Sequence, residues 1–382
     1  MINIAIIGTG NINGFHIPAI QTFPERCKIV ALVDIVPEKA AEKKESYGLH
    51  EAEVFASHEE MIKSGIKVDL AHICTPPYVH ASIAIDCMNA GINVLVEKPM
   101  ATCLAECDAM LEAEKRNGVQ MHVIAQNRFR NQHWKLKKLV ESGTAGKIRV
   151  AHINSFWWRG HSYYDLWWRG AWETEGGGPT LNHAVHHMDL LNWIQDDLPF
   201  ELTAVLANVM HDNSEVEDIS FAILKYKDGS VANVTSSVVH HGSRQNVELQ
   251  CEFAGIYAPF DVVSSKSLQN GFPIENKELE EEITKLYESI PDLKYEGHTA
   301  QVDDVLTALE TGKPALIDGI SGRRTIELIT AIYKSGFEKE RVSLPITSND
   351  EYYRFEGIPL NAIYFHKKTT SKMDLGNEDI SV

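Results

Sequence analysis

The first third of the chain alternates short apolar runs with longer amphipathic segments. Ile2–Ile7 is an apolar run that ends at Gly8, and Lys28–Val33 is a second one that ends at Asp34. Short apolar runs bounded by turn residues predict buried strands. Pro37–Tyr47 instead shows helical spacing between a Pro and a Gly, the usual punctuation of a helix. Further strands are predicted at Leu70–Cys74, Val94–Val96 and Met121–Ala125, and further helices at Ile17–Phe23 and Val79–Ala90.

The order of these elements determines the architecture that we expect for residues 1–125. When strands and helices alternate at this spacing, the strands run parallel and the helices cross over between them. We therefore predict a doubly wound α/β domain over residues 1–125, with its ligand at the carboxyl ends of the strands.

The pattern changes after about residue 125. Longer helices are predicted at Asn131–Ser142 and Pro179–Ile194, and they are followed by segments in which apolar and polar residues alternate. Residues 227–230 (Lys-Asp-Gly-Ser) join two such segments as a hairpin turn would. We therefore predict an α+β domain with antiparallel strands over residues 126–382. Its alternating segments are Thr203–Met210, Ile219–Tyr226, Val231–Val239 and Val247–Phe253, its closing helices are Glu296–Glu310 and Arg323–Ser335, and the polar end from Lys367 is expected to be loose.

The charge of the chain restricts its partners. It carries 53 Asp and Glu against 36 Lys and Arg, a formal net charge of −17. Phosphate backbones and anionic membranes repel such a polyanion, so we expect neither nucleic acid nor a membrane as a partner. The six cysteines, including Cys103 and Cys107, form no regular framework, which favours reduced thiols and no metal. No signal peptide precedes Ile2 and no segment reaches the ~18 apolar residues of a membrane span, so we expect a cytoplasmic protein.

A glycine-rich turn follows the first strand. Gly8 would permit a tight turn, and Gly10 would let the backbone approach a pyrophosphate at the N-terminus of the next helix. Asn13 stands where the third glycine of this pattern is usual, so the helix and strand are expected to pack slightly less closely there. Asp34 ends the second strand, where a carboxylate accepts ribose hydroxyls and repels a 2′-phosphate. These residues predict NAD as the cofactor in preference to NADP.

Four motifs occur in an order that resembles a known family. They are Gly8–His16, Cys74–His80, Glu97-Lys-Pro99, and three glycines from Gly176 that precede His186-x-x-Asp. Together they resemble the Gfo/Idh/MocA family of glucose–fructose oxidoreductase, inositol dehydrogenase and related sugar enzymes, over nearly the whole chain. The resemblance implies a Rossmann domain followed by an α+β domain with a large, mostly antiparallel, open-faced sheet. In the family this sheet often forms an oligomer interface, so we expect a homo-oligomer, a dimer or a tetramer.

The resemblance also implies roles for residues of the first domain. Lys98 ends a buried strand at the carboxyl edge of the parallel sheet and is expected to hydrogen-bond the reacting hydroxyl. Glu97 is expected to position Lys98 or the nicotinamide ribose, and a cis peptide is expected at Pro99. The residues expected to bind the cofactor are Gly8, Gly10, Asn11, Ile12, Asp34, Thr75, Pro76, His80, Glu97, Lys98 and Asn127.

The predicted helix Pro179–Ile194 carries a second set of candidates. Asn182, His186, Asp189 and Trp193 fall at helical intervals and would form one stripe. In the family, a carboxylate commonly stands four residues before the histidine. Asn182 cannot tune the histidine by charge but can orient a substrate hydroxyl, and Asp189 is expected to have a supporting role.

The general base is expected on this helix. His186 is the preferred base for oxidation of an alcohol, because an imidazole titrates near neutral pH. A histidine on a helix is more often structural, which is a credible interpretation of the neighbouring His183 and His187, and Lys98 could serve as the base in place of His186. Lys98 and His186 are therefore the predicted catalytic residues, and both are expected to contact the substrate.

Five of the seven tryptophans lie between residues 157 and 172. The sequence Trp157-Trp-Arg-Gly recurs ten residues later as Trp167-Trp-Arg-Gly. Indole rings stack on sugar C–H faces, and Arg makes bidentate contacts with polar groups. Arg169 and Trp172 are therefore predicted to bind the substrate. An aromatic cluster of this kind is also typical of a subunit contact, and the sequence leaves both interpretations open.

These residues predict an NAD(H)-dependent oxidoreductase that transfers a hydride between nicotinamide and a hydroxyl-bearing carbon of a sugar, polyol, glycoside or sugar acid. Two alternatives stay open. One is an enzyme that retains NAD and oxidises its substrate only transiently, for epimerisation or glycosidic cleavage. The other is a non-catalytic regulator that binds the dinucleotide, which is disfavoured because a regulator has no need for Lys98 and His186.

Overall fold

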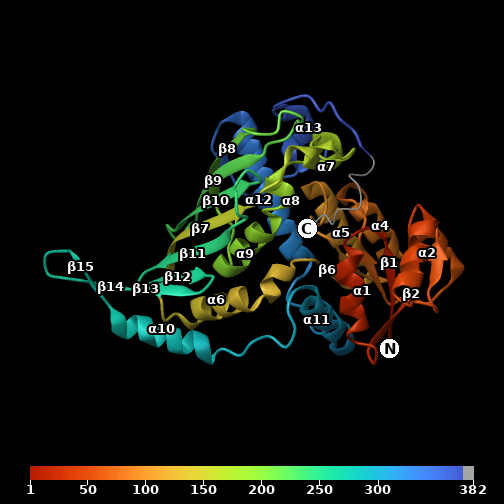
Figure 1. Cartoon of the computed structure of the whole chain (residues 1–382), viewed down its shortest axis with the longest axis horizontal. Helices are drawn as coiled ribbons and strands as arrows, with labels where there is room; N and C mark the ends of the chain where they lie inside the picture. The colour runs from red at the N-terminus through yellow and green to blue at the C-terminus, as the bar shows by residue number, and fades with distance from the viewer. Residues whose placement is uncertain (373–382) are drawn as a thin grey trace. The chain divides into compact units, whose positions relative to one another are not determined.

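The structure, a computed structural model, describes residues 1–372, which form two compact units (Figure 1). The first contains Met1–Phe129 and Lys294–Ile326, and the second contains Arg130–Leu293 and residues 327–372. This arrangement differs in one respect from a single boundary near residue 125, because the chain returns to the first unit after residue 293. The assignment of cofactor and substrate functions to residues 1–125 and 126–382 stays a prediction.

The first unit is built on a six-stranded parallel sheet, with the strand order β3-β2-β1-β4-β5-β6. The direction in which strands are added reverses between β1 and β4, and ligands of such sheets bind outside the carboxyl ends at this point. The strands are β1 Ile2–Ile7, β2 Cys27–Val33, β3 Glu53–Phe55, β4 Leu70–Ile73, β5 Asn93–Val96 and β6 Met121–Val123. The helices are α1 Asn13–Gln21, α2 Pro37–Ser46, α3 His58–Ser64, η1 Pro77–Val79, α4 His80–Asn89, α5 Leu104–Asn117, η2 Gln126–Phe129 and α11 Gly297–Thr311.

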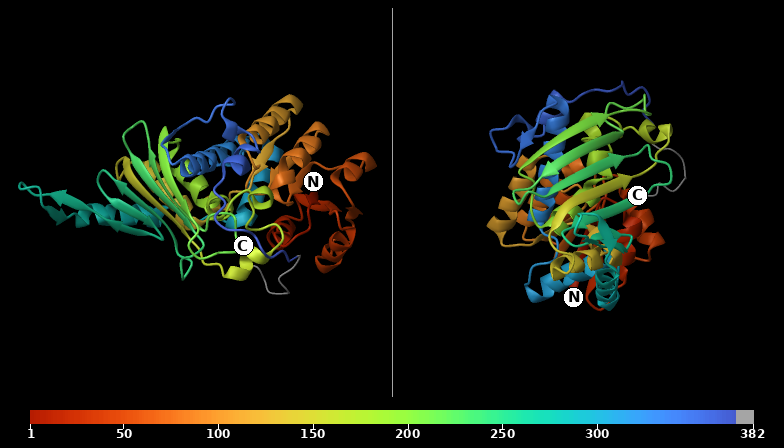
Figure 2. Two further views of the ribbon diagram at one scale, coloured as in Figure 1. Left: turned by 90° about the horizontal axis from the view of Figure 1, so that it is seen from above. Right: turned by 90° about the vertical axis from the view of Figure 1, so that its left-hand side faces the viewer.

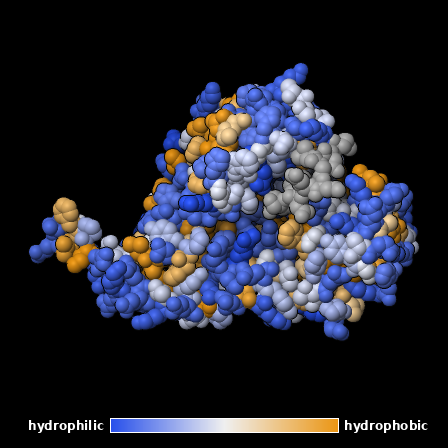
Figure 3. Space-filling model, in the orientation of Figure 1, coloured by the Kyte–Doolittle hydropathy of each residue, from blue (hydrophilic) through white to orange (hydrophobic). Residues whose placement is uncertain are grey.

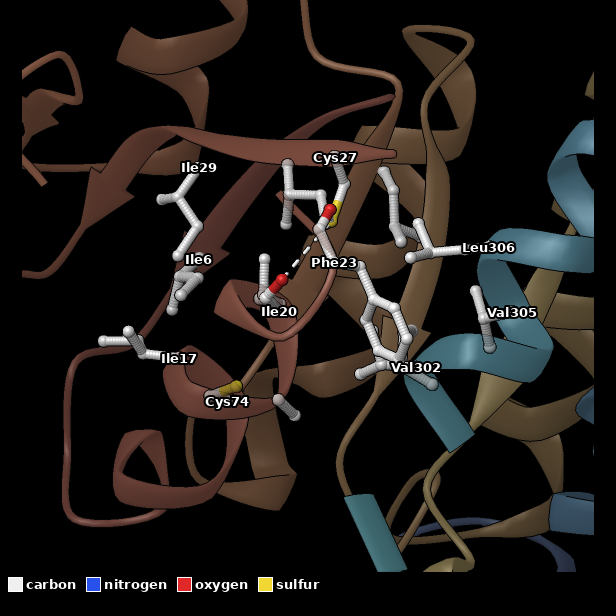
Figure 4. Close-up of a cluster of buried hydrophobic side chains, with 14 of the residues drawn as sticks. Ile6, Ile17, Ile20, Phe23, Cys27, Ile29, Cys74, Val302, Val305 and Leu306 are labelled. Carbon is white, nitrogen blue, oxygen red and sulfur yellow. Dashed lines mark hydrogen bonds between the residues drawn. The ribbon is translucent and has the colours of Figure 1, made fainter. Parts of the chain in front are cut away.

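One apolar cluster joins the first strands of this sheet to α1 and α11 (Figure 4). Ile6 and Ile17 are fully buried, and Val302 and Leu306 of α11 are at most 1% exposed in the same cluster. Burying one such side chain stabilises a fold by about 1.5–3 kcal/mol. Helix α11 is therefore part of the core of the first unit, although it follows the whole of residues 130–293 in the sequence.

The second unit contains an eight-stranded sheet with the order β13-β12-β11-β7-β10-β9-β8-β16. Among its described strands, β7 and β10 pair in parallel and all other neighbours are antiparallel. The predicted hairpin turn is confirmed, because Tyr226 N–H donates to the Ser230 carbonyl between β9 and β10. The strands are β7 Ile148–Phe156, β8 Glu201–Ala207, β9 Ile219–Lys225, β10 Val231–Ser237, β11 Gln245–Cys251, β12 Gly255–Ala258, β13 Asp261–Val263 and β16 Val342–Ser343.

Helices cover one face of this sheet and leave the other open. In β9, Leu224 is buried whereas Phe221 and Ile223 are 45% and 58% exposed. On the covered face, Gly336 of α12 (Gly319–Glu338) packs directly against Leu206 of β8. The right-hand view of Figure 2 shows the uncovered face. The other helices of the unit are α6 Asn131–Ser142, η3 His161–Asp165, α7 Trp172–Glu175, α8 Pro179–Asn182, α9 Val185–Gln195, η4 Glu351–Tyr353 and α13 Gly357–Asn361.

A small hairpin of β14 (Ser265–Ser267) and β15 (Pro273–Glu275) projects away from the large sheet and precedes α10 (Lys277–Ser289) (Figure 1). Figure 3 shows apolar residues on it. Leu268 and Phe272 in its turn are 45% and 66% exposed. The sequence pattern did not predict this hairpin, because its residues show no alternation of apolar and polar positions.

The last part of the chain bears on two expectations. Residues 373–382, most of the tail that was expected to be loose, lie outside the described residues. Among residues 1–372, no helix combines the length and the apolar character that a membrane crossing requires.

Candidate active site

Gly8 shapes the turn after β1. Its φ is +91°, and a Cβ there would lie 2.8 Å from the backbone carbonyl of Cys74, so only glycine fits. Gly10 is exposed and its Cβ position is open, so the backbone at the N-terminal end of α1 can be approached by a pyrophosphate. The looser packing expected at Asn13 is not found. Asn13 is fully buried, and its Nδ2 donates to the carbonyls of Gly8 and Gly10 at 2.8 and 3.2 Å.

Asp34 lies at the end of β2 and is bonded to the glycine turn. Its Oδ2 accepts hydrogen bonds from the backbone N–H and the hydroxyl of Thr9, at 2.8 and 2.7 Å. Its Oδ1 accepts the backbone N–H of Val36 at 2.9 Å. These bonds fix the carboxylate at the strand end, where it can also accept a ribose hydroxyl and would repel a 2′-phosphate.

The Glu97-Lys98-Pro99 motif follows β5 directly. The Lys98–Pro99 peptide is cis, as the resemblance implied. Lys98 is partly exposed, whereas Glu97 is only 5% exposed. The Oε2 of Glu97 accepts the backbone N–H of Lys98 at 3.1 Å, so the carboxylate holds the backbone from which the Lys98 side chain projects.

His80 does not lie where the expected role in cofactor binding would require. Its ring is fully buried, with Nδ1 at 2.9 Å from the Pro99 carbonyl and Nε2 at 2.7 Å from the Thr75 carbonyl. Burial lowers the pKa of His80, although both carbonyls favour its charged form. Because the backbone occupies both ring nitrogens, His80 cannot contact a dinucleotide. We correct its role to that of a bridge between the loops after β4 and β5.

The other expected cofactor residues follow the carboxyl ends of the strands in the first unit. Asn11 is exposed and Ile12 partly exposed at the start of α1, and Asn127 lies in η2 after β6. Pro76 is exposed after β4, and the buried Oγ1 of its neighbour Thr75 has no hydrogen-bond partner among the described residues. A hydroxyl without a partner, on the residue that packs against Gly8, fits the polar groups of a dinucleotide.

A cluster of ionisable side chains is buried around Glu97. His16 Nε2 and His298 Nε2 lie 2.9 and 3.6 Å from Glu97 Oε1, and His16 Nδ1 lies 3.0 Å from His72 Nδ1. Burial lowers the pKa of His16, but the interactions with Cys74 and Glu97 outweigh burial and raise it to about 10. Burial raises the pKa of Glu97, but the two histidines on its Oε1 hold it well below its ordinary value. Burial and the nearby His16 charge lower the pKa of His72. At neutral pH the cluster therefore contains a His16–Glu97 ion pair beside a neutral His72.

In the second unit, the predicted helix over residues 179–194 is broken. The backbone N–H groups of residues 183 and 184 both donate to the Pro179 carbonyl, at 3.1 and 2.8 Å. The second bond spans five residues, one more than in an α-helix, and it ends α8 before α9 begins. Asn182 therefore belongs to a different helix from His186. The expected stripe is interrupted after Asn182, while Asp189 and Trp193 do share α9 with His186.

Asn182 is bonded to the glycine segment that precedes it. Its Nδ2 donates to the carbonyls of Gly177 and Gly178, at 2.8 and 3.4 Å. The side-chain amide thus braces the turn, and its expected contact with a substrate hydroxyl stays a prediction. His186 and Asp189 are 8% and 5% exposed on α9.

The histidines that flank His186 have structural surroundings. His187 is 3% exposed, and burial lowers its pKa to about 3, so it is a poor base at neutral pH. The ring of His183 contacts those of Trp157 and Tyr163. These surroundings favour His186 over both neighbours as the base.

Two glycines before α8 are packed against a buried glutamate and a tyrosine. A Cβ on Gly178 would lie 2.0 Å from the backbone oxygen of Glu217, and one on Gly177 would lie 2.0 Å from Tyr333 Oη. Glu217 accepts hydrogen bonds from the backbone N–H groups of Gly178 and Thr180 and from Tyr333 Oη, each at 3.1 Å. Burial raises the pKa of Glu217 to about 7. This arrangement fixes the start of the segment that carries His186.

Trp172 does not have the position that a substrate contact requires. It is fully buried, its rings pack edge-on against Tyr333 and Phe337, and its Nε1 donates to the Ile363 carbonyl at 3.2 Å. We correct its role to that of a core residue. The sequence could not distinguish an exposed indole from a buried one.

Arg169 is held within the tryptophan segment. Its guanidinium lies between the rings of Trp168 and Tyr163, at 4.0 and 4.2 Å from their centroids, and Nη1 donates to Glu175 Oε1 at 2.8 Å. The Lys368 ammonium donates to the carbonyls of Tyr164, Leu166 and Arg169, which ties this segment to the end of the described chain. Since Glu175 neutralises Arg169, contact with the substrate stays a prediction for a side chain that is 15% exposed.

Comparison with known families decides the classification. Residues 2–125 match the model described as an oxidoreductase family with an NAD-binding Rossmann fold, and residues 133–257 match the GFO/IDH/MocA C-terminal domain. The chain belongs to the Gfo/Idh/MocA family. It is therefore an NAD-dependent oxidoreductase, and the predicted Rossmann domain and large, mostly antiparallel sheet are confirmed.

Relatives of this Gfo/Idh/MocA chain span most of its length. It is 25% identical to myo-inositol 2-dehydrogenase of Thermotoga maritima, over 89% of this chain and 98% of that one. It is 27% identical to 2,7-anhydro-N-acetylneuraminate hydratase of Mediterraneibacter gnavus, over 65% of each. Among solved structures, the WlbA dehydrogenase of Bordetella pertussis in complex with NADH and UDP-GlcNAcA superposes with a TM-score of 0.77 at 28% identity, covering 91% of this chain and 98% of that one.

Sequence reasoning missed two residues of this region. His298 lies 201 positions after Glu97, and only the packing of α11 on α1 brings it there. Glu217 lies between two predicted strands and carries no local signal of its contact with the glycines. In both cases the informative contact is long-range, and no single sequence displays it.

Proposed function

We propose that this oxidoreductase transfers a hydride between NAD and a hydroxyl-bearing carbon of a sugar or polyol, including glycosides and sugar acids. The observation that carries the proposal is the position of Lys98. The glycine turn, Asp34 and Lys98 follow β1, β2 and β5 of one parallel sheet, so a dinucleotide-binding backbone and an ammonium share one sheet edge. The inositol dehydrogenase and the sugar-nucleotide complex among the similar proteins support this class of substrate.

The side chains would have complementary roles. Bound NAD would accept the hydride in the direction of oxidation. As the carbon loses its hydride, the hydroxyl must lose a proton, which we assign to His186 as the general base. The Lys98 ammonium hydrogen-bonds the same oxygen and stabilises its developing negative charge. The cofactor would be held by the glycine turn, Asp34, Thr75 and Asn127.

Lys98→Met and His186→Gln test these roles. Loss of either group should lower the single-turnover rate of hydride transfer about 10²-fold or more. Lys115→Met and His50→Gln are matched controls, because both residues are exposed and lie away from the carboxyl ends of the strands, Lys115 near the end of α5 and His50 before β3. Both should leave the rate within about twofold. A panel of inositols, aldoses, glycosides and sugar acids, followed at the NADH absorbance band, identifies the substrate.

Two results would contradict this assignment. If His186→Gln leaves both the rate and its pH profile intact, His186 is not the base. If Lys98→Met retains full activity, the proposed chemistry at the sheet edge fails.

A second function has support from one relative. The similar protein from Mediterraneibacter gnavus is named a hydratase and not a dehydrogenase. In the corresponding reaction here, NAD would remain bound, and oxidation would be reversed before product release. Dinucleotide that copurifies with the protein, together with turnover that releases no NADH, would favour this second function over the first.

We also propose that the chain forms a cytoplasmic homo-oligomer through the uncovered face of its large sheet. Phe221, Ile223 and Val205 on this face are 45%, 58% and 60% exposed, and exposed apolar patches of this kind mark protein contacts. None of the six cysteines, all of which lie within residues 1–372, forms a disulfide, in keeping with a reducing compartment. Ile223→Asp should lower the mass measured by light scattering, whereas Lys225→Asp at the edge of the same face should not. An unchanged mass for Ile223→Asp contradicts this interface.

A further inference from the structure

The cluster around Glu97 is an unusual place for charge. His16 is fully buried and Glu97 is 5% exposed, and they form an ion pair at 2.9 Å. Desolvation makes a buried ion pair weak or neutral as a stabilising element, and apolar residues of similar volume are often as good or better. An ion pair retained at such a position therefore points to a role other than stability.

We propose that His16 and His298 are positioning residues for hydride transfer, which act through the Glu97 carboxylate to fix the backbone and the electrostatic surroundings of Lys98. This inference rests on the proposed function of Lys98. Glu97 uses its two oxygens on opposite sides, Oε1 toward the two histidines and Oε2 toward the Lys98 N–H at 3.1 Å. The orientation of the carboxylate therefore determines the orientation of the peptide at Lys98.

The positions of the two histidines give the cluster a second property. His16 belongs to α1, whose first residues form the expected pyrophosphate site, and His298 belongs to α11. The His298 ring stacks on Phe15 of α1 at 5.3 Å. The Glu97 carboxylate thus joins the cofactor helix to the strand end that carries Lys98, and a cofactor that orders α1 would also order Lys98.

The charge of the cluster should reach Lys98 as well. The protonated His16 ring offsets the negative charge of Glu97, which is bonded directly to the Lys98 backbone. A neutral side chain in place of His16 leaves an unbalanced negative charge, which favours the ammonium form of Lys98. The ionisable groups that face Glu97 and its partners are His16 of α1, His72 of β4, Cys74 after β4, His80 of α4, Lys98 after β5, His122 of β6 and His298 of α11.

The first experiment measures single-turnover hydride transfer against pH in the full-length protein. One limb of the plot of rate against pH should be absent in Lys98→Met. His16→Gln should move this limb to higher pH by about 0.5 unit or more. His298→Leu removes a ring nitrogen that lies 3.6 Å from Glu97 Oε1, an ion-pair contact beyond hydrogen-bond distance, and should slow transfer by about fivefold. His298→Gln should recover most of the rate, because its amide keeps a polar N–H group near the carboxylate. His58→Gln is the matched control, because it removes an imidazole bonded to a surface carboxylate, Asp86, at 3.0 Å.

The second experiment asks whether the histidines act through Glu97. In a Glu97→Gln background, His298→Leu should have less than about a twofold further effect, because residues of one network are not additive. If the two effects multiply instead, the inference is wrong. A loss of hydride transfer in Lys98→Met with unshifted pH profiles in the histidine variants also overturns the inference, while leaving the proposed function in place.

A third measurement needs no variant that might unfold. Histidine side-chain NMR of the wild-type protein should show one imidazolium that persists above pH 8, because the pKa of His16 is raised to about 10. If every histidine is neutral at pH 8.5, the ion pair is absent and the inference fails. Since His16, Glu97 and His298 could together hold a metal ion, one equivalent of zinc in the purified, active protein would also overturn it.

Discussion

Asp34 has a structural role beside the recognition role that we propose for it. Three hydrogen bonds tie its carboxylate to Thr9 and Val36, so its position does not depend on a ligand. The negative charge is nevertheless partly exposed at the end of β2. A preorganised charge of this kind selects between cofactors by repulsion as well as by attraction.

The first prediction concerns this selection. Asp34→Ser should improve binding of NADPH relative to NADH by about tenfold, because it removes the repulsion of a 2′-phosphate at short range. The ratio of dissociation constants, measured by NADH and NADPH fluorescence, checks this result.

Asp69→Ser is the matched control for Asp34→Ser. Asp69 also accepts a backbone N–H at 2.8 Å, from Asn3, but it lies at the opposite end of the sheet. Its loss should lower stability without a change in cofactor preference. An unchanged preference in Asp34→Ser, or an equal change in both variants, would contradict the assigned role of Asp34.

At the scale of helices and strands, the local sequence pattern predicted the bounds of an element well wherever its buried positions recur at a regular interval. The predicted helices at 37–47 and 131–142 and the strands at 219–226 and 231–239 are found within one or two residues, because each has a clear apolar period. The break between α8 and α9 could not be predicted, because the segment keeps a helical apolar pattern across it. The segment that leads into α8 is fixed by contacts of Gly177 and Gly178 with Tyr333 and Glu217, which are distant in the sequence.

The same difference between local and long-range signals separates the residues of the candidate site. The glycine turn, Asp34 and the Glu97-Lys98 pair were predictable because their signals are local motifs. Trp172 and His80 were misassigned because their residue types suit both ligand binding and packing, and only burial decides between the two.

The second prediction concerns the segment before α8. Gly178→Ala should lower the free energy of unfolding by at least about 2 kcal/mol, because its Cβ would meet the Glu217 backbone oxygen and no side chain can move aside. It should also slow hydride transfer, since the displaced segment leads directly into the His186 helix. Urea unfolding and single-turnover kinetics measure the two effects.

Gly14→Ala serves as the control for stability. A Cβ there meets only the Tyr47 hydroxyl at 4.0 Å, and alanine favours a helix over glycine by up to about 1 kcal/mol. This variant should be as stable as the wild type or more so. Equal destabilisation of the two variants would show that the clash at Gly178 is not the cause.

At the scale of the whole molecule, several buried histidines link stability to pH. Burial lowers the pKa of His122 to about 4 and that of His187 to about 3. Burial also lowers the pKa values of His72 and His80. Below pH 6.5 the unfolded chain takes up protons at these positions and the folded chain does not, so stability falls as the pH is lowered.

The third prediction is a maximum of stability near pH 6.5–7. As the pH falls below 6.5, each histidine that stays neutral in the folded protein should lower the free energy of unfolding by about 1.4 kcal/mol per pH unit. Glu217, with a pKa raised to about 7, holds a proton in the folded state between pH 4.5 and 7 and offsets part of one histidine. Toward alkali, His16, with a pKa raised to about 10, loses its contribution as the pH rises from 6.5 through 10.

Urea unfolding at several pH values checks this profile. His187→Asn should reduce the acid slope by about one histidine, or 1.4 kcal/mol per pH unit. A free energy of unfolding that is constant between pH 5 and 7 would contradict the proposed titration of the buried histidines.

The packing of α11 in the first unit has a consequence for synthesis of the protein. The core around Ile6 and Ile17 is completed by Val302 and Leu306, so residues 130–293 must leave the ribosome before that core can close. At 5–20 residues per second, this delay is roughly 10 to 30 s. During that interval the nascent N-terminal sheet exposes an apolar strip that its own residues cannot cover. Translation speed and chaperone access over this stretch therefore belong to the conditions under which the cofactor-binding unit can form.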